Sequence, residues 1–304
     1  MRGSRPVLLP LPLLAALPLA LAMLAPGPAH AQIEPNLSTY TGPNAKGYLG
    51  PLNEGFGAAL QSLLYRTADL PEHDVRVNLS VKTMFVKFGD DDRTFQASTP
   101  EGFFPEQIAT APTVVGNERG VEVGGDAGTS YTFPGGFDVG SLGIAVPEIT
   151  ISGIYGSEIS ARFIAFDTGD TDLGDLSLIG VGARHSISRY FPDLPVSIAA
   201  GLFWQKFEMG EDLIDANALT VGVQASRAFG VLEPYVGLSY DSFDMSVDYE
   251  DAGDPPTRLS VDFDKQNNAR LTGGLSLNLS FVHLQAEGSL SDKTAFGFGL
   301  SLGN

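Results

Sequence analysis

The chain has 304 residues, of which 43% are hydrophobic and 18% charged, and its 36 acidic against 18 basic residues give a formal net charge of −18. This charge excludes a nucleic-acid binder, which needs a basic surface to displace counterions from phosphates. The lack of cysteine excludes thiolate metal sites, disulfide scaffolds and thiol nucleophiles. The hydrophobic content favours a folded chain with a sizeable core.

The first 31 residues are typical of a secretory signal peptide. Two arginines precede the apolar run 7–25, and Ala29 and Ala31 are the small residues expected at positions −3 and −1 of a cleavage site. The run approaches the ~20 residues of a spanning helix, but its three prolines disfavour a retained membrane anchor. We therefore expect cleavage after Ala31 and export towards the outer membrane of a bacterial cell.

The body of the chain alternates between apolar and polar residues. In the segment 270–281, Leu271, Leu275 and Leu279 fall on one face, and serine, threonine and asparagine fall on the other. Neighbouring residues of a strand point to opposite faces, so this period of two predicts strands with one apolar face. The same split recurs in segments 75–82, 196–205, 219–226, 282–290 and 295–302.

Two architectures produce this pattern: a soluble sandwich or barrel, and a membrane barrel whose apolar face meets lipid. The polar face is rich in Gly, Ser, Asn and Gln and poor in charge, which favours a crowded lumen. Short connections at 188–195, 229–233 and 280–281 also alternate with longer acidic ones at 167–175, 209–215 and 248–257. We therefore predict an all-β, transmembrane, antiparallel up-and-down β-barrel with short periplasmic turns and long outer loops.

We expect about twelve strands, within a range of 10–14. Ten is the rival count, which applies if Glu54 to Arg66 forms a short helix and 89–146 is one outer excursion. The predicted organisation is a signal peptide at 1–31, a periplasmic segment at 32–54, and a barrel at 55–304 with a long irregular insertion at about 89–146. The candidate strands are 55–67, 74–88, one within 113–133, 147–155, 157–166, 176–188, 195–208, 215–229, 232–249, 257–280, 282–290 and 293–303.

Several short motifs resemble an uncharacterised family, a domain of unknown function, of bacterial outer-membrane β-barrel proteins. This resemblance implies location and fold, and it implies no chemistry. The motifs are Tyr48-Leu49-Gly50-Pro51 to Phe56-Gly57, Ala58-Ala59-Leu60-Gln61-Ser62 to Tyr65-Arg66-Thr67-Ala68, Asp90-Asp91-Asp92-Arg93-Thr94-Phe95, Gly180-Val181-Gly182-Ala183-Arg184-His185 and Arg189-Tyr190-Phe191-Pro192.

Catalysis lacks a recognisable constellation in this sequence. The Gly-x-Ser-x-Gly string at 299–303 lies in an alternating segment and not at the strand-to-helix turn of a nucleophile elbow, and His73, His185 and His283 lack metal-ligand spacing. We predict that the protein is no enzyme and has no catalytic residues, no metal site and no cofactor. Alternation instead places a set of charged and polar side chains inward, where they set the field of an open lumen or pair with a plug. These lumen-facing candidates are Arg76, Lys82, Glu148, Glu158, Arg162, Arg184, Asp241, Arg270, His283 and Glu287.

The function expected from this pattern is a passive channel or transporter for a small solute, with a hydrophobic solute among the candidates. The alternative is a non-conducting structural or surface-interaction barrel, and a less favoured third is a lipid-modifying barrel enzyme. The expected partners are outer-membrane lipid, the outer-membrane assembly machinery and an unidentified small solute, and nucleic acid is excluded.

Overall fold

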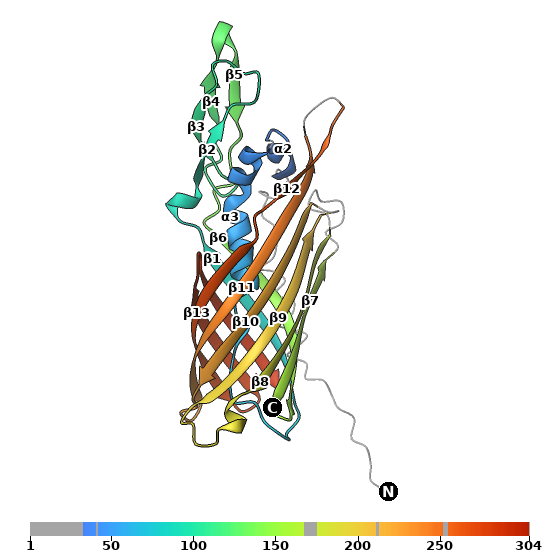
Figure 1. Ribbon diagram of the computed structural model, residues 1–304, viewed down its shortest axis with the longest axis vertical. Helices are drawn as coiled ribbons and strands as arrows, with labels where there is room; N and C mark the ends of the chain where they lie inside the picture. Colours follow the sequence, from blue (N-terminus) through green and yellow to red (C-terminus); the bar gives the residue numbers. More distant parts are fainter. Residues whose placement is uncertain (1–32, 41, 167–174, 211–212, 252–254, 304) are drawn as a thin grey trace.

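A computed structural model describes residues 33–40, 42–166, 175–210, 213–251 and 255–303. Ten antiparallel strands of this described chain close into a barrel, because β1 pairs with β15 on one side and with β6 on the other (Figure 1). The predicted all-β antiparallel barrel is therefore confirmed. The strands are β1 (Arg76–Lys87), β6 (Ser141–Ile154), β7 (Ser157–Phe166), β8 (Leu176–Ser186), β9 (Ser197–Met209), β10 (Ile214–Ser226), β11 (Leu232–Glu250), β13 (Gln266–Leu279), β14 (Val282–Leu290) and β15 (Thr294–Gly303).

The expected count of twelve strands is wrong, and the rival count of ten is the one observed. The candidate strand 55–67 is instead the end of helix α3 (Pro43–Leu60) followed by coil. The candidate within 113–133 falls in a hairpin whose two strands pair only with each other. Short apolar runs fit a buried helix as well as a strand, which explains the first error.

A lobe stands beyond the end of the barrel that carries the longer connections (Figure 1). We call it the loop-end lobe, made of residues 33–54 and 88–140. It contains α2 (Ile33–Leu37), the hairpin of β2 (Thr94–Ser98) with β3 (Ile108–Pro112), and the hairpin of β4 (Val121–Gly124) with β5 (Ser130–Phe133). At the same end, β12 (Arg258–Asp262) pairs with the tip of β11. The short 3₁₀ turns η2 (Asp90–Asp92) and η3 (Asp126–Gly128) lie in the lobe, and η4 (Ser188–Tyr190) lies in a connection at the opposite, turn end.

Aromatic packing joins the two parts of the loop-end lobe. The rings of Tyr40 and Tyr48 lie 5.2 Å apart between centroids, and Tyr40 also stacks on Phe133 at 6.3 Å. The hydroxyl of Tyr48 donates a hydrogen bond of 3.1 Å to the carbonyl of Gly135. Burial raises the pKa of Tyr48 to about 12, since the phenolate would lose its hydration.

Helix α3 runs from the lobe into the barrel, and the chain then continues through the lumen to the turn end, where β1 begins (Figure 1). We call residues 61–75 the threaded segment. The described residues of the segment 32–54, which we predict to be periplasmic, thus lie at the end that we predict to face outwards. The two predictions conflict, and the structure assigns residues 33–54 to the loop end. The predicted signal peptide lies outside the described residues.

Strand β11 shows that the polarity of the barrel wall inverts partway along its length. From Leu232 to Tyr240 the outward residues are apolar, and Val236 and Leu238 are 58% and 57% exposed. The inward residues here are polar and buried, including Glu233 and Asp241. Beyond Asp241 the inward residues become apolar and buried (Phe243, Met245, Val247, Tyr249), and the outward ones become polar (Asp244, Ser246, Asp248, Glu250).

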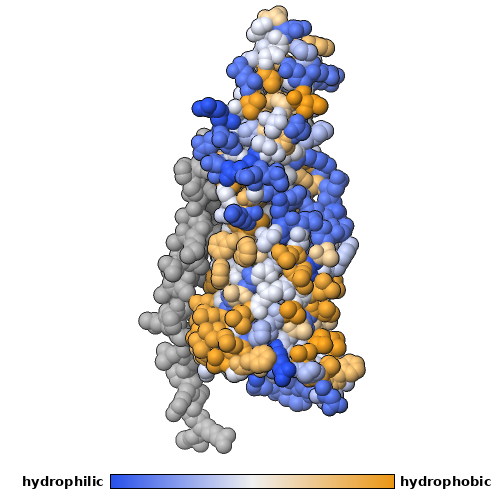
Figure 2. Space-filling view, turned by 90° about the vertical axis from the view of Figure 1, so that its left-hand side faces the viewer, coloured by the Kyte–Doolittle hydropathy of each residue, from blue (hydrophilic) through white to orange (hydrophobic). Residues whose placement is uncertain are grey.

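Other strands change in the same sense, which divides the barrel into two sections. Inward pairs that mark the change, with the apolar residue towards the loop end, are Met84 and Lys82, Val146 and Glu148, Phe207 and Gln205, and Ala218 and Thr220. Figure 2 shows the apolar surface gathered over the turn-end half of the barrel and a polar surface above it. The section near the turns has a polar interior and an apolar exterior, and the section near the lobe has the reverse. None of the helices in the described part of the chain is long and apolar enough to cross a membrane.

Candidate functional site

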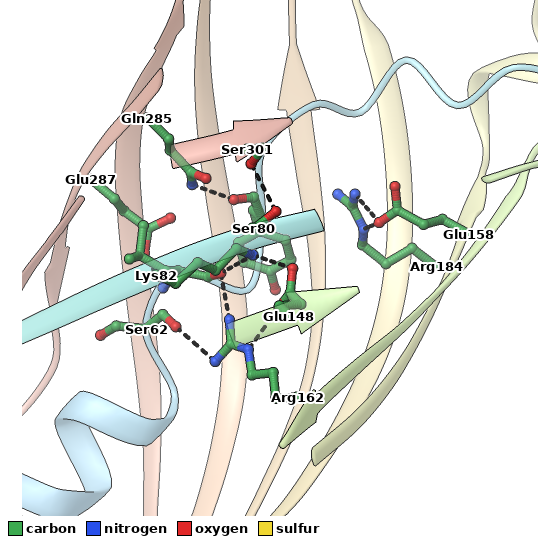
Figure 3. A network of polar contacts seen from close by, with 12 residues as sticks. Ser62, Ser80, Lys82, Glu148, Glu158, Arg162, Arg184, Gln285, Glu287 and Ser301 are labelled. Carbon is green, nitrogen blue, oxygen red and sulfur yellow. Dashed lines mark hydrogen bonds and ion pairs between the residues drawn. The ribbon is translucent and has the colours of Figure 1, made fainter. Parts of the chain in front are cut away.

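The candidate site is the interior of the turn-end section, where strand side chains surround the threaded segment (Figure 3). The lumen-facing candidates Lys82, Glu148, Glu158, Arg162, Arg184, Asp241, Arg270 and Glu287 are all buried here, between 2% and 7% exposed. His283 is 9% exposed and bonds the amide oxygen of Asn278 at 2.9 Å. Arg76 lies at the turn end, where its half-exposed side chain bonds Asp74 at 3.1 Å.

Seven of the eight buried candidates form ion pairs between neighbouring strands, and Glu287 instead accepts hydrogen bonds from Tyr235 and from the main chain of Leu63. One carboxylate oxygen of Glu148 forms an ion pair with Lys82 Nζ at 2.6 Å, and the other forms one with Arg162 Nε at 2.7 Å. Glu148 and Arg162 face each other directly in the β6–β7 register, so strand pairing itself brings them together. Two further pairs, Arg184 with Glu158 and Arg270 with Asp241, complete the set. Such pairing offsets the cost of removing each charge from water.

The same cations also bind the main chain of the threaded segment. The carbonyl oxygen of Leu63 accepts hydrogen bonds from Lys82 Nζ at 2.7 Å and from an Arg162 guanidinium nitrogen at 2.6 Å. The backbone N–H of Leu63 donates to Glu287 Oε1 at 2.6 Å. Figure 3 shows Lys82, Glu148 and Arg162 in one cluster beside the coil that follows α3. Leu63 has a φ of 55°, so its main chain is turned sharply towards these groups.

Barrel side chains also cap the end of α3. The last carbonyls of a helix have no partner within the helix and carry partial negative charge. Arg270 donates to the carbonyl of Ala58 at 3.3 Å, and Gln205 donates to the carbonyl of Leu60. The helix therefore ends on cations and amides of the wall, which explains why it stops at the level where the interior becomes polar.

Inward-facing glycines make room for the side chains of the threaded segment. A Cβ added at Gly297 would lie 2.5 Å from Leu63 Cγ, and one at Gly222 would lie 2.2 Å from the hydroxyl of Tyr65. Tyr65 also lies against Gly237 at 3.0 Å by the same measure. These three glycines are thus the places on the wall where Leu63 and Tyr65 fit.

Sequence reasoning missed several groups of this site. Glu233 accepts hydrogen bonds from Thr67, from Ser226 at 2.8 Å and from Asn278 at 3.0 Å, and Tyr235 donates to Glu287 at 2.8 Å. Their signal was present, because residues 233 and 235 share the parity of Asp241 on β11. The threaded segment carried no such signal, since its residues make no regular pattern.

The remaining features of the site are small. One polar cavity in the lumen, lined by Lys82, Glu148, Glu158 and Arg184 among others, has room for about one water molecule. On the outer face at the turn end, His185 bonds Ser157 at 2.8 Å and Tyr190 at 2.9 Å. In the described part of the chain, no group of three or more His, Asp or Glu is placed to hold a metal ion.

The fold and the site define a β-barrel that is closed by its own N-terminal chain. The chain belongs to the family described as "Family of unknown function (DUF6588)", whose model matches residues 12–304. This confirms the predicted membership of an uncharacterised family. No curated protein matches the sequence.

Solved structures similar to this chain include several barrels. The transport unit of the autotransporter AIDA-I from Escherichia coli is 8% identical, with a TM-score of 0.31 over 83% of this chain and 97% of that one. The outer membrane protease OmpT from Escherichia coli is 10% identical, with a TM-score of 0.32 over 80% and 98%. The CymD monoaromatic hydrocarbon channel is 10% identical, with a TM-score of 0.22 over 83% and 96%.

Proposed function

We propose that this protein is an outer-membrane β-barrel that is closed to solutes and holds its loop-end lobe outside the cell as a surface for a binding partner. The proposal retains the predicted outward orientation of the long connections and places residues 33–54 outside with them. Outer-membrane lipid and the assembly machinery are its proposed partners in the membrane.

The apolar exterior of the turn-end section supports insertion in a bilayer. The outward apolar part of β11 runs from Leu232 to Tyr240, which matches the ~9–11 residues of a tilted spanning strand. Next to it, the exterior of the lobe-end section is polar, as a surface in water requires. The single tryptophan, Trp204, points outward two residues before Lys206, close to the boundary between the two sections, where interfacial aromatics gather.

The observation that carries the closed state is the threaded segment. It occupies the polar interior of the described barrel, and buried groups of the wall bond its main chain from several sides. A solute would have to displace this segment to pass. The polar character of these contacts favours a second candidate function, passage of a small solute after such displacement.

Planar-bilayer conductance of the refolded full chain separates these two functions. Ser62 Oγ and Ser289 Oγ lie 3.3 Å apart, so S62C/S289C provides an oxidisable lock between the threaded segment and β14. We expect the wild type and both redox states of the lock to conduct no more than a bare bilayer. The closed barrel would be overturned in favour of solute passage if the wild type and the reduced S62C/S289C variant both showed conductance steps that the oxidised variant lacks.

The proposed orientation has its own test. Phe104 in the lobe is 64% exposed and Leu194 at the turn end is 40% exposed. We expect a membrane-impermeant maleimide to label Phe104→Cys on whole cells and Leu194→Cys only after the outer membrane is opened. The reverse result would contradict the orientation. The proposed function includes no catalysis; unchanged phospholipid and lipid-A profiles for cells that carry His185→Ala or His283→Ala are the expected outcome.

A further inference from the structure

We propose that the inner wall of the turn-end section is a binding site for an irregular polypeptide main chain, and that residues 60–68, the last residue of α3 and the coil after it, are its built-in occupant. Recognition of this main chain by the lumen is independent of whether the barrel conducts.

The wall recognises backbone groups along the whole occupant. Its side-chain donors come from different strands, and most of the carbonyls in residues 60–67 accept at least one of their hydrogen bonds. Ala68 N–H in turn donates to Ser226 Oγ at 2.9 Å. The donor pairs are Gln205 to Leu60, Arg162 to Ser62, Lys82 and Arg162 to Leu63, Gln285 to Tyr65, Ser276 to Arg66, and Arg184 to Thr67.

The charge pattern of the wall explains why a neutral main chain fits. The carboxylates of Glu148 and Glu158 are already paired with cations, so those cations have spare N–H groups that need acceptors. Arg184 uses its spare nitrogen on the carbonyl of Thr67 at 2.9 Å, and Arg162 uses its own on Leu63. Buried donors without acceptors are costly, and peptide carbonyls supply acceptors without adding net charge.

Two side chains of the occupant fit against glycines of the wall. Leu63 fits against Gly297, and Tyr65 fits against Gly222 and Gly237. Tyr65 also packs edge-on against Phe203 at 5.9 Å between centroids. The ligand class is therefore a peptide that adopts an irregular coil and carries a leucine and a tyrosine two residues apart.

The tether that joins this occupant to the barrel is accessible. Residues 72–75 are exposed at the turn end, after the last residue of the occupant, where Glu72 contacts Tyr155 and Arg189 and Asp74 contacts Arg76. A protease site inserted between Glu72 and His73 of the full chain therefore allows the occupant to be cut from β1 after the barrel has folded. The occupant then becomes an ordinary ligand whose binding can be measured.

We expect the cut N-terminal piece to stay bound through gel filtration and to exchange with an excess of a labelled synthetic peptide of residues 43–72. The helix alone, residues 43–60, should compete at least about tenfold less well, because it lacks the main-chain contacts. Peptides with Leu63→Ala or Tyr65→Ala should also bind about tenfold more weakly, and one with Asp69→Ala, a change at an exposed residue, should bind within about threefold of the parent.

The cut piece also includes α3, whose packing in the lobe-end section could by itself hold the piece in place. Two variants of the barrel wall separate this effect from the main-chain contacts. Lys82→Gln removes a donor to the occupant and should speed its release about tenfold. Arg76→Gln, which removes a half-exposed charge at the turn end, should leave the release rate unchanged. Loss of the cut piece from a barrel that remains folded by its heat-modifiable gel mobility would overturn the inference, as would equal binding of the 43–72 and 43–60 peptides.

Discussion

Glu148 is the anion on which the buried network depends, so Glu148→Gln is the sharpest perturbation of this barrel. The carboxylate takes Lys82 at 2.6 Å and Arg162 at 2.7 Å, and all three side chains are at most 5% exposed. The amide keeps the shape and one acceptor, but it leaves two buried cations together without their counter-charge. Breaking a buried pair in this way costs about 3–5 kcal/mol of the free energy of unfolding.

The measurement is urea unfolding of the refolded protein in lipid vesicles, followed by the fluorescence of the single tryptophan, Trp204. A loss of about 3–5 kcal/mol lowers the folded-to-unfolded ratio by about two to four orders of magnitude, which a midpoint shift at constant slope reports. Arg76→Gln is the matched control, because its ion pair with Asp74 is half-exposed and contributes about 0–1 kcal/mol.

A double variant separates charge balance from side-chain packing. Glu148→Gln with Lys82→Met removes one charge of each sign, so it should be more stable than the sum of the single changes predicts, by about 0.5–3 kcal/mol. The reasoning is refuted if Glu148→Gln unfolds within about 0.5 kcal/mol of the wild type, a range typical of surface changes. It is also refuted if the two changes are additive.

Three further changes test the glycines that contact the threaded segment, the apolar outer face of β11 and the burial of Tyr48 in the lobe. Gly297→Ala places a methyl 2.5 Å from a side chain of the threaded segment and should cost about 1–3 kcal/mol in the same assay, whereas Gly273→Ala meets no atom within 4 Å and should change little. Leu238→Arg should cost about 2–4 kcal/mol if this outward residue meets lipid. Asp244→Arg, beyond the inversion, removes only an exposed ion pair with Lys265 and should cost at most about 1 kcal/mol; equal effects would contradict the two sections. Because burial raises the pKa of Tyr48 to about 12, its neutral phenol stabilises the lobe below the unfolded pKa of 10.0, and this contribution is lost as the pH rises through 12. The tyrosinate absorbance that Tyr48→Phe removes should therefore have its midpoint near pH 12, and a midpoint near 10 would show an exposed phenol.

Much of the barrel follows from alternation, because each strand after residue 147 keeps one parity inward. That parity placed Glu148, Arg162 and Arg184 in the lumen, and antiparallel pairing then set them beside their partners. The inversion on β11 was beyond this reasoning. Phe243 has the same parity as Asp241, and a period of two assigns a face without saying whether water, lipid or a helix meets it.

The path of the threaded segment could not be predicted from the sequence for a different reason. Residues 61–75 have no secondary structure that repeats, and their partners lie far away in the chain, as Leu63 with Glu287 shows. From the sequence, the glycines of the polar face indicate only a crowded lumen. Gly297, Gly222 and Gly237 make room for Leu63 and Tyr65, but this depends on which segment enters the barrel. No local sequence pattern predicts which segment does so.

Barrel size, wall polarity and the threaded segment require one another. The interior of an eight-stranded barrel is just filled by its own side chains, and interior width grows with strand number. Ten strands therefore leave space along the axis, and glycines such as Gly297 widen it locally. A wall with buried charges around that space needs an occupant that offers both donors and acceptors, because any buried cation or anion left unmatched destabilises the fold. The main chain of the threaded segment meets these conditions, so the closed lumen is the arrangement in which the pairs around Glu148 and Glu158 are satisfied.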